Sequence, residues 1–156
     1  MYDVAIIGTG PAAVSAAINL KIHNKNIIMF GTKELSKKVQ KSEQIINYPG
    51  ITTINGAALN DRFMEHLTSM DINITEQMVT NINQMSDNFM LLGGNDVYDA
   101  KSILLCVGAT SAKGFSGEDE LLGKGVSYCA TCDGFLYRNK KIAVFVGDKK
   151  YEHEVK

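Results

Sequence analysis

The chain opens on the stretch VAIIGTGPAA, residues 4–13, which joins a short apolar run to a glycine-rich turn. The run 4–7 is uninterrupted and rich in branched side chains, as is typical of a parallel strand buried on both faces. Small and apolar residues follow at helical spacing from Pro11 to about Leu20, and proline is tolerated in the first turn of a helix. A second strand-like run at 26–30 completes a βαβ unit of about 30 residues. These patterns predict an α/β domain with a parallel sheet.

The turn fits the dinucleotide-binding fingerprint G-x-G-x-x-G/A, with alanine as its third small residue. The first glycine permits a tight turn, the second lets a pyrophosphate approach the backbone, and the alanine lets helix and strand pack closely. The helix N-terminus would receive the negative charge. An ordinary glycine-rich turn is the alternative interpretation. The candidate cofactor-binding residues here are Gly8, Gly10, Pro11, Ala12 and Ala13.

The fingerprint is incomplete at the end of the second strand. An acidic residue usually stands there and binds the ribose hydroxyls. This sequence has Phe30-Gly31-Thr32 instead, and Glu34 is the nearest carboxylate. The ribose contact is therefore left open.

Composition and charge describe a globular chain without an obvious polyanionic partner. Of the 156 residues, 45% are hydrophobic and 21% are charged, and the formal net charge of −1 gives no reason to expect nucleic acid or a membrane surface. No apolar run approaches the roughly 20 residues of a membrane helix, and the start lacks the basic character of a secretory signal. Three cysteines are too few for a disulfide framework. We therefore expect a cytoplasmic protein.

The rest of the chain predicts two domains. A long ordered loop is expected over 31–55, because it carries several turn formers and little periodicity. An amphipathic helix should follow with Leu59, Phe63 and Leu67 on its apolar side and Asn55 as a possible cap, and short β segments should fill 72–99, including a hairpin across 93–95. A buried strand at 102–107 should end at Gly108. The expected domains are 1–112 and 113–156, the second opening with a connection and a strand at 141–146.

A pair of cysteines, Cys129 and Cys132, is the second chemical feature. Their Cys-x-x-Cys spacing permits a tight intramolecular disulfide, and a carboxylate, Asp133, follows directly. Redox chemistry is the natural use of such a pair. A zinc site would need two further ligands, and the three histidines are isolated, so no metal is predicted. Two unreactive buried cysteines are the other alternative, and Cys106, alone inside an apolar strand, is interpreted as structural.

Together the fingerprint and the stretch CATCDGF at 129–135 resemble the bacterial low-molecular-weight thioredoxin reductases. The resemblance extends over nearly the whole chain, through NYPG at 47–50, VGAT at 107–110, GVSY at 125–128 and YRNKK at 137–141. It implies a Rossmann-like, three-layer ββα FAD-binding domain, incomplete here, followed by the start of a second Rossmann-like domain that carries the Cys-x-x-Cys.

The resemblance also implies roles for residues. FAD would lie on the glycine turn with help from Asn47, Gly108 and Ala109. Cys132 would meet the flavin, Cys129 would exchange with thioredoxin, and Asp133 would handle protons. A carboxylate at this position is also suited to capping a helix, and that alternative stays open. The resemblance further implies a homodimer.

The chain departs from the family where NADPH would bind. The second glycine fingerprint is replaced by VGDKKY at 146–151, with Val146, Asp148 and Tyr151 at the positions of the two glycines and the small helix residue. These residues compromise the turn, and Asp148 would repel a pyrophosphate. The nearest group without NADPH is the ferredoxin-dependent flavin thioredoxin reductases, so ferredoxin is the expected electron donor. Lys37, Lys38 and Lys41 are either a docking patch for an acidic donor or a solvated loop.

Two further departures bear on the flavin and on length. The family's Gly-Gly-Gln-Leu flavin contact has no clear counterpart, and SKKVQ at 36–40 occupies that region. Members of the family are about twice as long and complete their FAD domain with a C-terminal part, so we expect a fragment rather than a naturally short relative. The alternatives to a ferredoxin-dependent reductase are an NADPH-dependent reductase of thioredoxin or peroxiredoxin, and a non-catalytic flavin-binding thiol switch.

Overall fold

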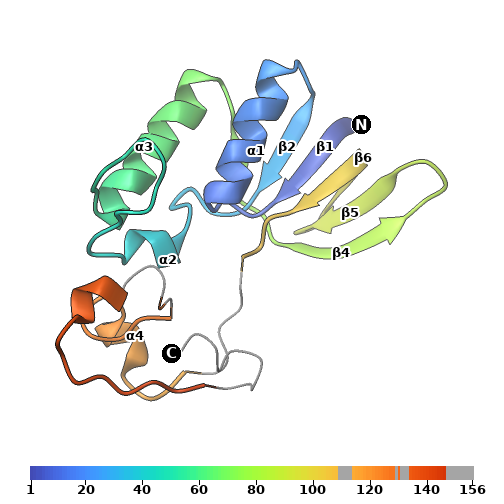
Figure 1. Cartoon of the computed structure of the whole chain (residues 1–156). Helices are drawn as coiled ribbons and strands as arrows, with labels where there is room; N and C mark the ends of the chain where they lie inside the picture. Colours follow the sequence, from blue (N-terminus) through green and yellow to red (C-terminus); the bar gives the residue numbers. More distant parts are fainter. Residues whose placement is uncertain (109–113, 129, 131–133, 147–156) are drawn as a thin grey trace. The chain divides into compact units, whose positions relative to one another are not determined.

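The computed structural model describes residues 1–108, 114–128, 130 and 134–146, and the chain divides into two compact units. The first unit comprises Met1–Gln40 and Ala58–Gly108, and the second comprises Lys41–Ala57 and Ala109–Lys156. The first unit contains a six-stranded sheet in the order β3-β2-β1-β6-β5-β4 (Figure 1). Its strands are β1 (Tyr2–Ile7), β2 (Ile27–Phe30), β3 (Ile74–Thr75), β4 (Val79–Gln84), β5 (Phe89–Gly93) and β6 (Asp96–Leu105).

The predicted βαβ unit is confirmed. β1 pairs in parallel with β2 on one side and with β6 on the other, so that Ile7 lies between Phe30 and Leu105. The crossover helix α1 (Pro11–Ile22) is two residues longer than the sequence indicated. It buries Ala13, Val14 and Ala17, and α1 and α3 (Gly56–Ser69) lie on the same side of the parallel strands in Figure 1.

The other face of the parallel strands is covered by the β4–β5–β6 meander. Leu91 and Ala100 from the meander form one buried cluster with Ala5, Ile28 and Phe30. The rings of Phe30 and Tyr98 meet edge to face, with centroids 5.0 Å apart. Since side chains alternate along a strand, Ile6 and Met29, both fully buried, point to the opposite face. Helices, parallel sheet and meander thus form the three layers expected for the ββα fold.

Strand β6 differs from the prediction of two separate segments at 97–98 and 102–107. It runs without a break from Asp96 to Leu105. Ala100 is the point of change, because it pairs with Phe89 in β5 and with Tyr2 in β1. The polar residues Asp99, Lys101 and Ser102 concealed this continuity, since only one face of the strand is buried there.

The loop predicted over 31–55 is ordered, but it contains one helical turn, α2 (Lys37–Gln40), and a bridge between Ile45 and Ile54. The helix predicted after it is confirmed as α3, with Leu59, Phe63 and Leu67 buried. The hairpin across 93–95 is also confirmed.

The second unit has little regular structure among its described residues. It contains a short helix, α4 (Glu118–Leu121), a 3-10 turn, η1 (Gly134–Tyr137), and a bridge between Leu122 and Val126. The strand predicted at 141–146 is not formed there, and Ile142, Val144 and Phe145 are exposed. An apolar strand of this type needs paired neighbours, and the described part of this unit offers no strand for it to pair with. Within the described residues, no helix is long and apolar enough to cross a membrane.

Candidate dinucleotide-binding site

The fingerprint turn connects the carboxyl end of β1 to the first turn of α1. Gly8 has φ +118°, and a Cβ built on it would overlap the carbonyl oxygen of Cys106. No residue other than glycine fits there without movement of the backbone. Ala13 is fully buried, as expected for the small residue that lets helix and strand pack closely.

The helix N-terminus of this turn is open to an anion. Gly10 is the N-cap, it has no side chain to cap the helix, and a Cβ built on it would meet no atom of the described residues within 4 Å. The first turn of α1 carries no acidic residue, and Pro11 stands at its start. Free backbone N–H groups and the positive end of the helix dipole favour a phosphate at such a position. The residues present therefore fit the pyrophosphate of a dinucleotide.

The predicted contact at Gly108 lies at the same end of the sheet. The backbone N–H of Cys106 donates to the carbonyl oxygen of Ile7 at 2.8 Å, which continues the β1–β6 pairing to the turn. Gly108 follows two residues later with φ +69°, and none of the described residues lies within 4 Å of the place where its Cβ would be. Cys106 is half-buried, and its backbone, rather than its thiol, packs against Gly8. The carboxyl ends of adjacent parallel strands are where ligands bind in open α/β sheets.

The packing at the end of β2 leaves no space for an acidic side chain. A Cβ built on Gly31 would lie 2.5 Å from Cγ2 and 2.9 Å from Oγ1 of Thr9. Thr9 is 6% exposed, so its side chain has little room to move away. Thr9, which stands between the first two glycines of the fingerprint, therefore occupies the space that an aspartate or glutamate at position 31 would need.

A carboxylate does lie near this end of the sheet, directly after β3. Glu76 accepts hydrogen bonds from the ammonium group of Lys33 at 2.9 Å and from the Lys33 backbone N–H at 3.4 Å. These two bonds hold the pKa of Glu76 below its ordinary value. Glu34 is exposed and lies 3.7 Å from Lys37. Neither position was predicted to bind the ribose, and both carboxylates are balanced by lysines.

Asn60, which lies on the buried side of α3, was not among the predicted site residues. It is 5% exposed, and its Nδ2 donates to the carbonyl oxygens of Glu34 and Ser36. A signal was present: position 60 is three residues before Phe63 and seven before Leu67, so a polar residue interrupts an apolar stripe.

The remaining predicted site residues belong to the second unit or lie outside the described residues. Asn47 is exposed and belongs to the second unit, so its contact with a cofactor stays a prediction. Ala109, Cys129, Cys132 and Asp133 lie outside the described residues, as do Asp148 and Tyr151. Lys37 and Lys38 lie on α2 of the first unit, and Lys41 begins the second.

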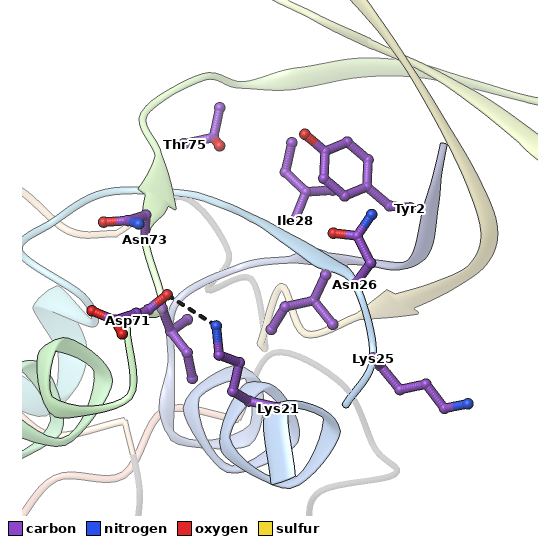
Figure 2. Close-up of a pocket in the computed structure, with 10 residues that line it drawn as sticks. Tyr2, Lys21, Lys25, Asn26, Ile28, Asp71, Asn73 and Thr75 are labelled. Atoms are coloured by element: carbon purple, nitrogen blue, oxygen red, sulfur yellow. Dashed lines mark hydrogen bonds between the residues drawn. The ribbon is translucent and has the colours of Figure 1, made fainter. Parts of the chain in front are cut away.

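A pocket of about 230 Å³ lies at the amino ends of β1 and β2, the end opposite the fingerprint turn (Figure 2). The ammonium group of Lys21 donates to the backbone carbonyl of Asp71 across its rim, at 3.4 Å. Its polar lining includes Tyr2, Asn26, Asn73 and Thr75. Because it opens at the other end of the strands, this pocket is separate from the candidate dinucleotide site.

Comparison with known sequences places the chain among disulfide oxidoreductases. A family model described as pyridine nucleotide-disulphide oxidoreductase matches residues 2–147. Thioredoxin reductase of Mycoplasma pneumoniae is 35% identical over 149 residues, which cover 94% of this chain and 47% of the relative. That of Bacillus subtilis is 32% identical over 148 residues, with the same coverage of both chains. The chain thus spans about half the length of the curated relatives it matches.

Solved structures with a similar fold come from the same kind of enzyme as these relatives. A ferredoxin-flavin thioredoxin reductase from Clostridium acetobutylicum is 49% identical with a TM-score of 0.70, over 87% of this chain and 47% of that one. Thioredoxin reductase from Streptococcus pyogenes is 31% identical with a TM-score of 0.80, over 88% of this chain and 45% of that one. Sequence and fold lead to one conclusion: the chain belongs to the pyridine nucleotide-disulphide oxidoreductase family.

Proposed function

We propose that the full-length protein is an FAD-dependent disulfide reductase that passes electrons through Cys129 and Cys132 to thioredoxin. The observation that carries this proposal is the turn at Gly8–Ala13, which offers an uncapped helix N-terminus and an open backbone at Gly10. FAD is the cofactor implied by the family and by the flavin named for the Clostridium structure. We expect the isolated 156-residue chain to be inactive, because relatives of about twice its length supply further structure.

The binding of FAD would rest on residues of the first unit and on Asn47. The turn would hold the pyrophosphate by backbone N–H groups, and Gly108 and Ala109 would border it from the end of β6. When bound, FAD supplies two-electron redox chemistry at the Cys-x-x-Cys.

The chemistry of this chain's own residues would be a thiol–disulfide exchange. Two electrons convert the Cys129–Cys132 disulfide into one thiolate and, with one proton, one thiol. The Cys129 thiolate would attack the thioredoxin disulfide, and Cys132 would resolve the mixed disulfide, leaving thioredoxin reduced and the pair oxidised. Asp133 would supply the proton that the leaving thiolate needs.

We propose ferredoxin as the electron donor. The 49% identity to a protein named a ferredoxin-flavin thioredoxin reductase supports it, and so do Val146, Asp148 and Tyr151 in place of the second glycine fingerprint. NADPH is the second candidate, because the family is named for pyridine nucleotides and its match extends to residue 147.

We further propose a cytoplasmic homodimer with its domains at 1–112 and 113–156.

The donor is tested by the absorbance of FAD in the full-length protein under anaerobic conditions. The protein is mixed in turn with NADPH and with chemically reduced ferredoxin. We expect bleaching of the oxidised-flavin absorbance with ferredoxin alone. Bleaching by NADPH would contradict the ferredoxin proposal, and a protein that binds no FAD would contradict the function as a whole.

A further inference from the structure

The segment that follows β2 is held by side chains at three consecutive carbonyl groups. Asn60 Nδ2 donates to the carbonyl oxygen of Glu34 at 3.1 Å and to that of Ser36 at 3.2 Å. Between them, the carbonyl oxygen of Leu35 accepts from Thr9 Oγ1 at 3.3 Å and from Thr32 Oγ1 at 3.2 Å. Hydrogen bonds to three successive carbonyls leave this segment little freedom to change conformation.

Leu35 needs to be held, because its backbone is in the left-handed region. It has φ +59° and is 4% exposed. A leucine in this conformation is strained, and the strain persists only where surrounding contacts determine the conformation. The carbonyls of Glu34 and Ser36, on either side of Leu35, are those that Asn60 binds.

Holding the carbonyl groups of Glu34 and Ser36 leaves one polar atom of Asn60 without a partner in the described part of the chain. Its Oδ1 is buried and has no hydrogen-bond partner among the described residues. Rotating the amide would not help, since Oδ1 would then face two carbonyl oxygens. An apolar side chain would fill this position of α3 without leaving an unsatisfied acceptor. The two donated bonds are therefore the reason for an asparagine here.

The segment is coupled to the dinucleotide site through Thr9. Thr9 is the middle residue of the Gly8-Thr9-Gly10 turn, and its hydroxyl donates to the Leu35 carbonyl. Its side chain also packs against Gly31, where the ribose-binding carboxylate usually stands. A shift of the 34–36 segment would leave the Thr9 hydroxyl without its acceptor and loosen the turn.

We propose that Asn60 is a positioning residue for the dinucleotide site. By holding Glu34 and Ser36 it fixes Leu35 in the left-handed conformation, and Leu35 in turn fixes Thr9 and the turn that receives the pyrophosphate. The segment 31–36 then forms the adenosine side of the site in place of an acidic residue. This inference rests on the proposed binding of FAD.

The test compares two alanine variants of α3 in the full-length protein. Asn60→Ala removes the donor of both hydrogen bonds to the 34–36 segment, and Leu67→Ala removes another buried side chain from the same helix, one that cannot donate a hydrogen bond. The dissociation constant of FAD is measured by flavin fluorescence, well below the unfolding temperature of each variant. We expect Asn60→Ala to raise it about tenfold or more and Leu67→Ala to change it less than about twofold.

Equal dissociation constants for wild type and Asn60→Ala would overturn the inference and leave the proposed function intact. A wild-type protein without FAD binding would instead remove the proposed function. If Asn60→Ala does not fold, Thr9→Val tests the next contact of the same argument, the hydrogen bond from Thr9 to the Leu35 carbonyl, because it keeps the shape and removes the hydroxyl. It should also weaken FAD binding, and unchanged binding would overturn the inference. Where both variants fold, the double variant should lose less than the product of the two single effects, since both act through Leu35.

Discussion

The two ends of the parallel sheet are both tied by polar contacts, but they differ in burial. At the amino end, Asp3 accepts from the Asn26 backbone N–H at 2.9 Å and from the Lys101 ammonium at 2.8 Å, in groups that are exposed to solvent. At the carboxyl end, Thr9 and Asn60 hold the segment after β2, and both are more than nine-tenths buried.

The difference in burial indicates which end of the sheet holds a fixed conformation. An exposed ion pair exchanges readily with water and contributes little net free energy. Buried neutral hydrogen bonds cannot be replaced by water, so breaking one leaves an unsatisfied group. The carboxyl end, where the dinucleotide is expected to bind, is the end at which buried side chains, those of Thr9 and Asn60, hold the backbone.

The largest effect is expected at Gly8. Gly8→Val places a branched side chain onto the Cys106 carbonyl at a φ of +118°. We expect a loss of roughly 2–4 kcal/mol of unfolding free energy and no measurable FAD binding. Urea unfolding and flavin fluorescence of the full-length protein measure the two effects. Gly10→Ala is the matched control for stability, since a Cβ there meets open space; equal destabilisation by both changes would contradict the close approach of Gly8 and Cys106.

The next largest effect is expected from Gly31→Asp, which restores the usual acidic residue. Its Cβ would lie 2.5 Å from Thr9 Cγ2, so the change should displace Thr9 and weaken FAD binding about tenfold. Combining it with Thr9→Ala makes room, and the double variant should bind FAD better than Gly31→Asp alone. Tighter FAD binding by the single variant would show that Thr9 yields easily and that the carboxyl end is less rigid than described.

A smaller effect is expected in the meander, between the two ends. Tyr98→Phe removes the hydroxyl that donates to Gln77 Oε1 at 2.8 Å, and it keeps the ring that contacts Phe30. We expect a loss of about 1 kcal/mol of unfolding free energy, because the hydrogen bond is part-buried. Chemical denaturation measures it. Tyr98→Leu, which also removes the ring contact, should cost more, and an equal cost would mean that the ring contact contributes nothing.

The smallest effect is expected from Asp3→Asn at the amino end. The hydrogen bond from Lys101, followed by that from the Asn26 N–H, holds the pKa of Asp3 below its ordinary value. A lowered pKa in the folded state contributes stability above the ordinary aspartate pKa of about 3.9, and this is lost as pH falls through the folded value. The melting temperatures of wild type and Asp3→Asn should differ slightly at neutral pH and converge in acid. A gap that widens in acid would reverse the sign assigned to Asp3.

Much of the first unit was predictable from local patterns. The run 4–7, the Gly8–Ala13 turn and the spacing of Leu59, Phe63 and Leu67 each carry a short-range signal that matches the structure. The continuity of β6 was not predictable, because polar residues stand in its middle, where its pairing changes from β5 to β1 at Ala100. The strand predicted at 141–146 was wrong, because an apolar run becomes a strand only where neighbouring strands are available to pair with it.

The candidate site likewise contains residues that local patterns predicted and residues that they did not. Its glycines were identifiable, because a glycine fingerprint between a strand and a helix is a local pattern. The contacts of Asn60 with Glu34 and Ser36 join residues about 25 positions apart, and nothing in the sequence near position 34 indicates them. The left-handed backbone of Leu35 was hidden as well, since leucine is uncommon in that conformation.

The most direct test of the proposed function is a single turnover of the full-length, FAD-loaded protein. The protein is reduced anaerobically with a limiting amount of dithionite and mixed with oxidised thioredoxin, and the new thioredoxin thiols are counted. We predict close to two thioredoxin thiols for each pair of electrons supplied in the wild type and none above background in Cys129→Ser or Cys132→Ser. Thiols formed equally by the variants, or none formed by the wild type, would contradict electron transfer through this pair.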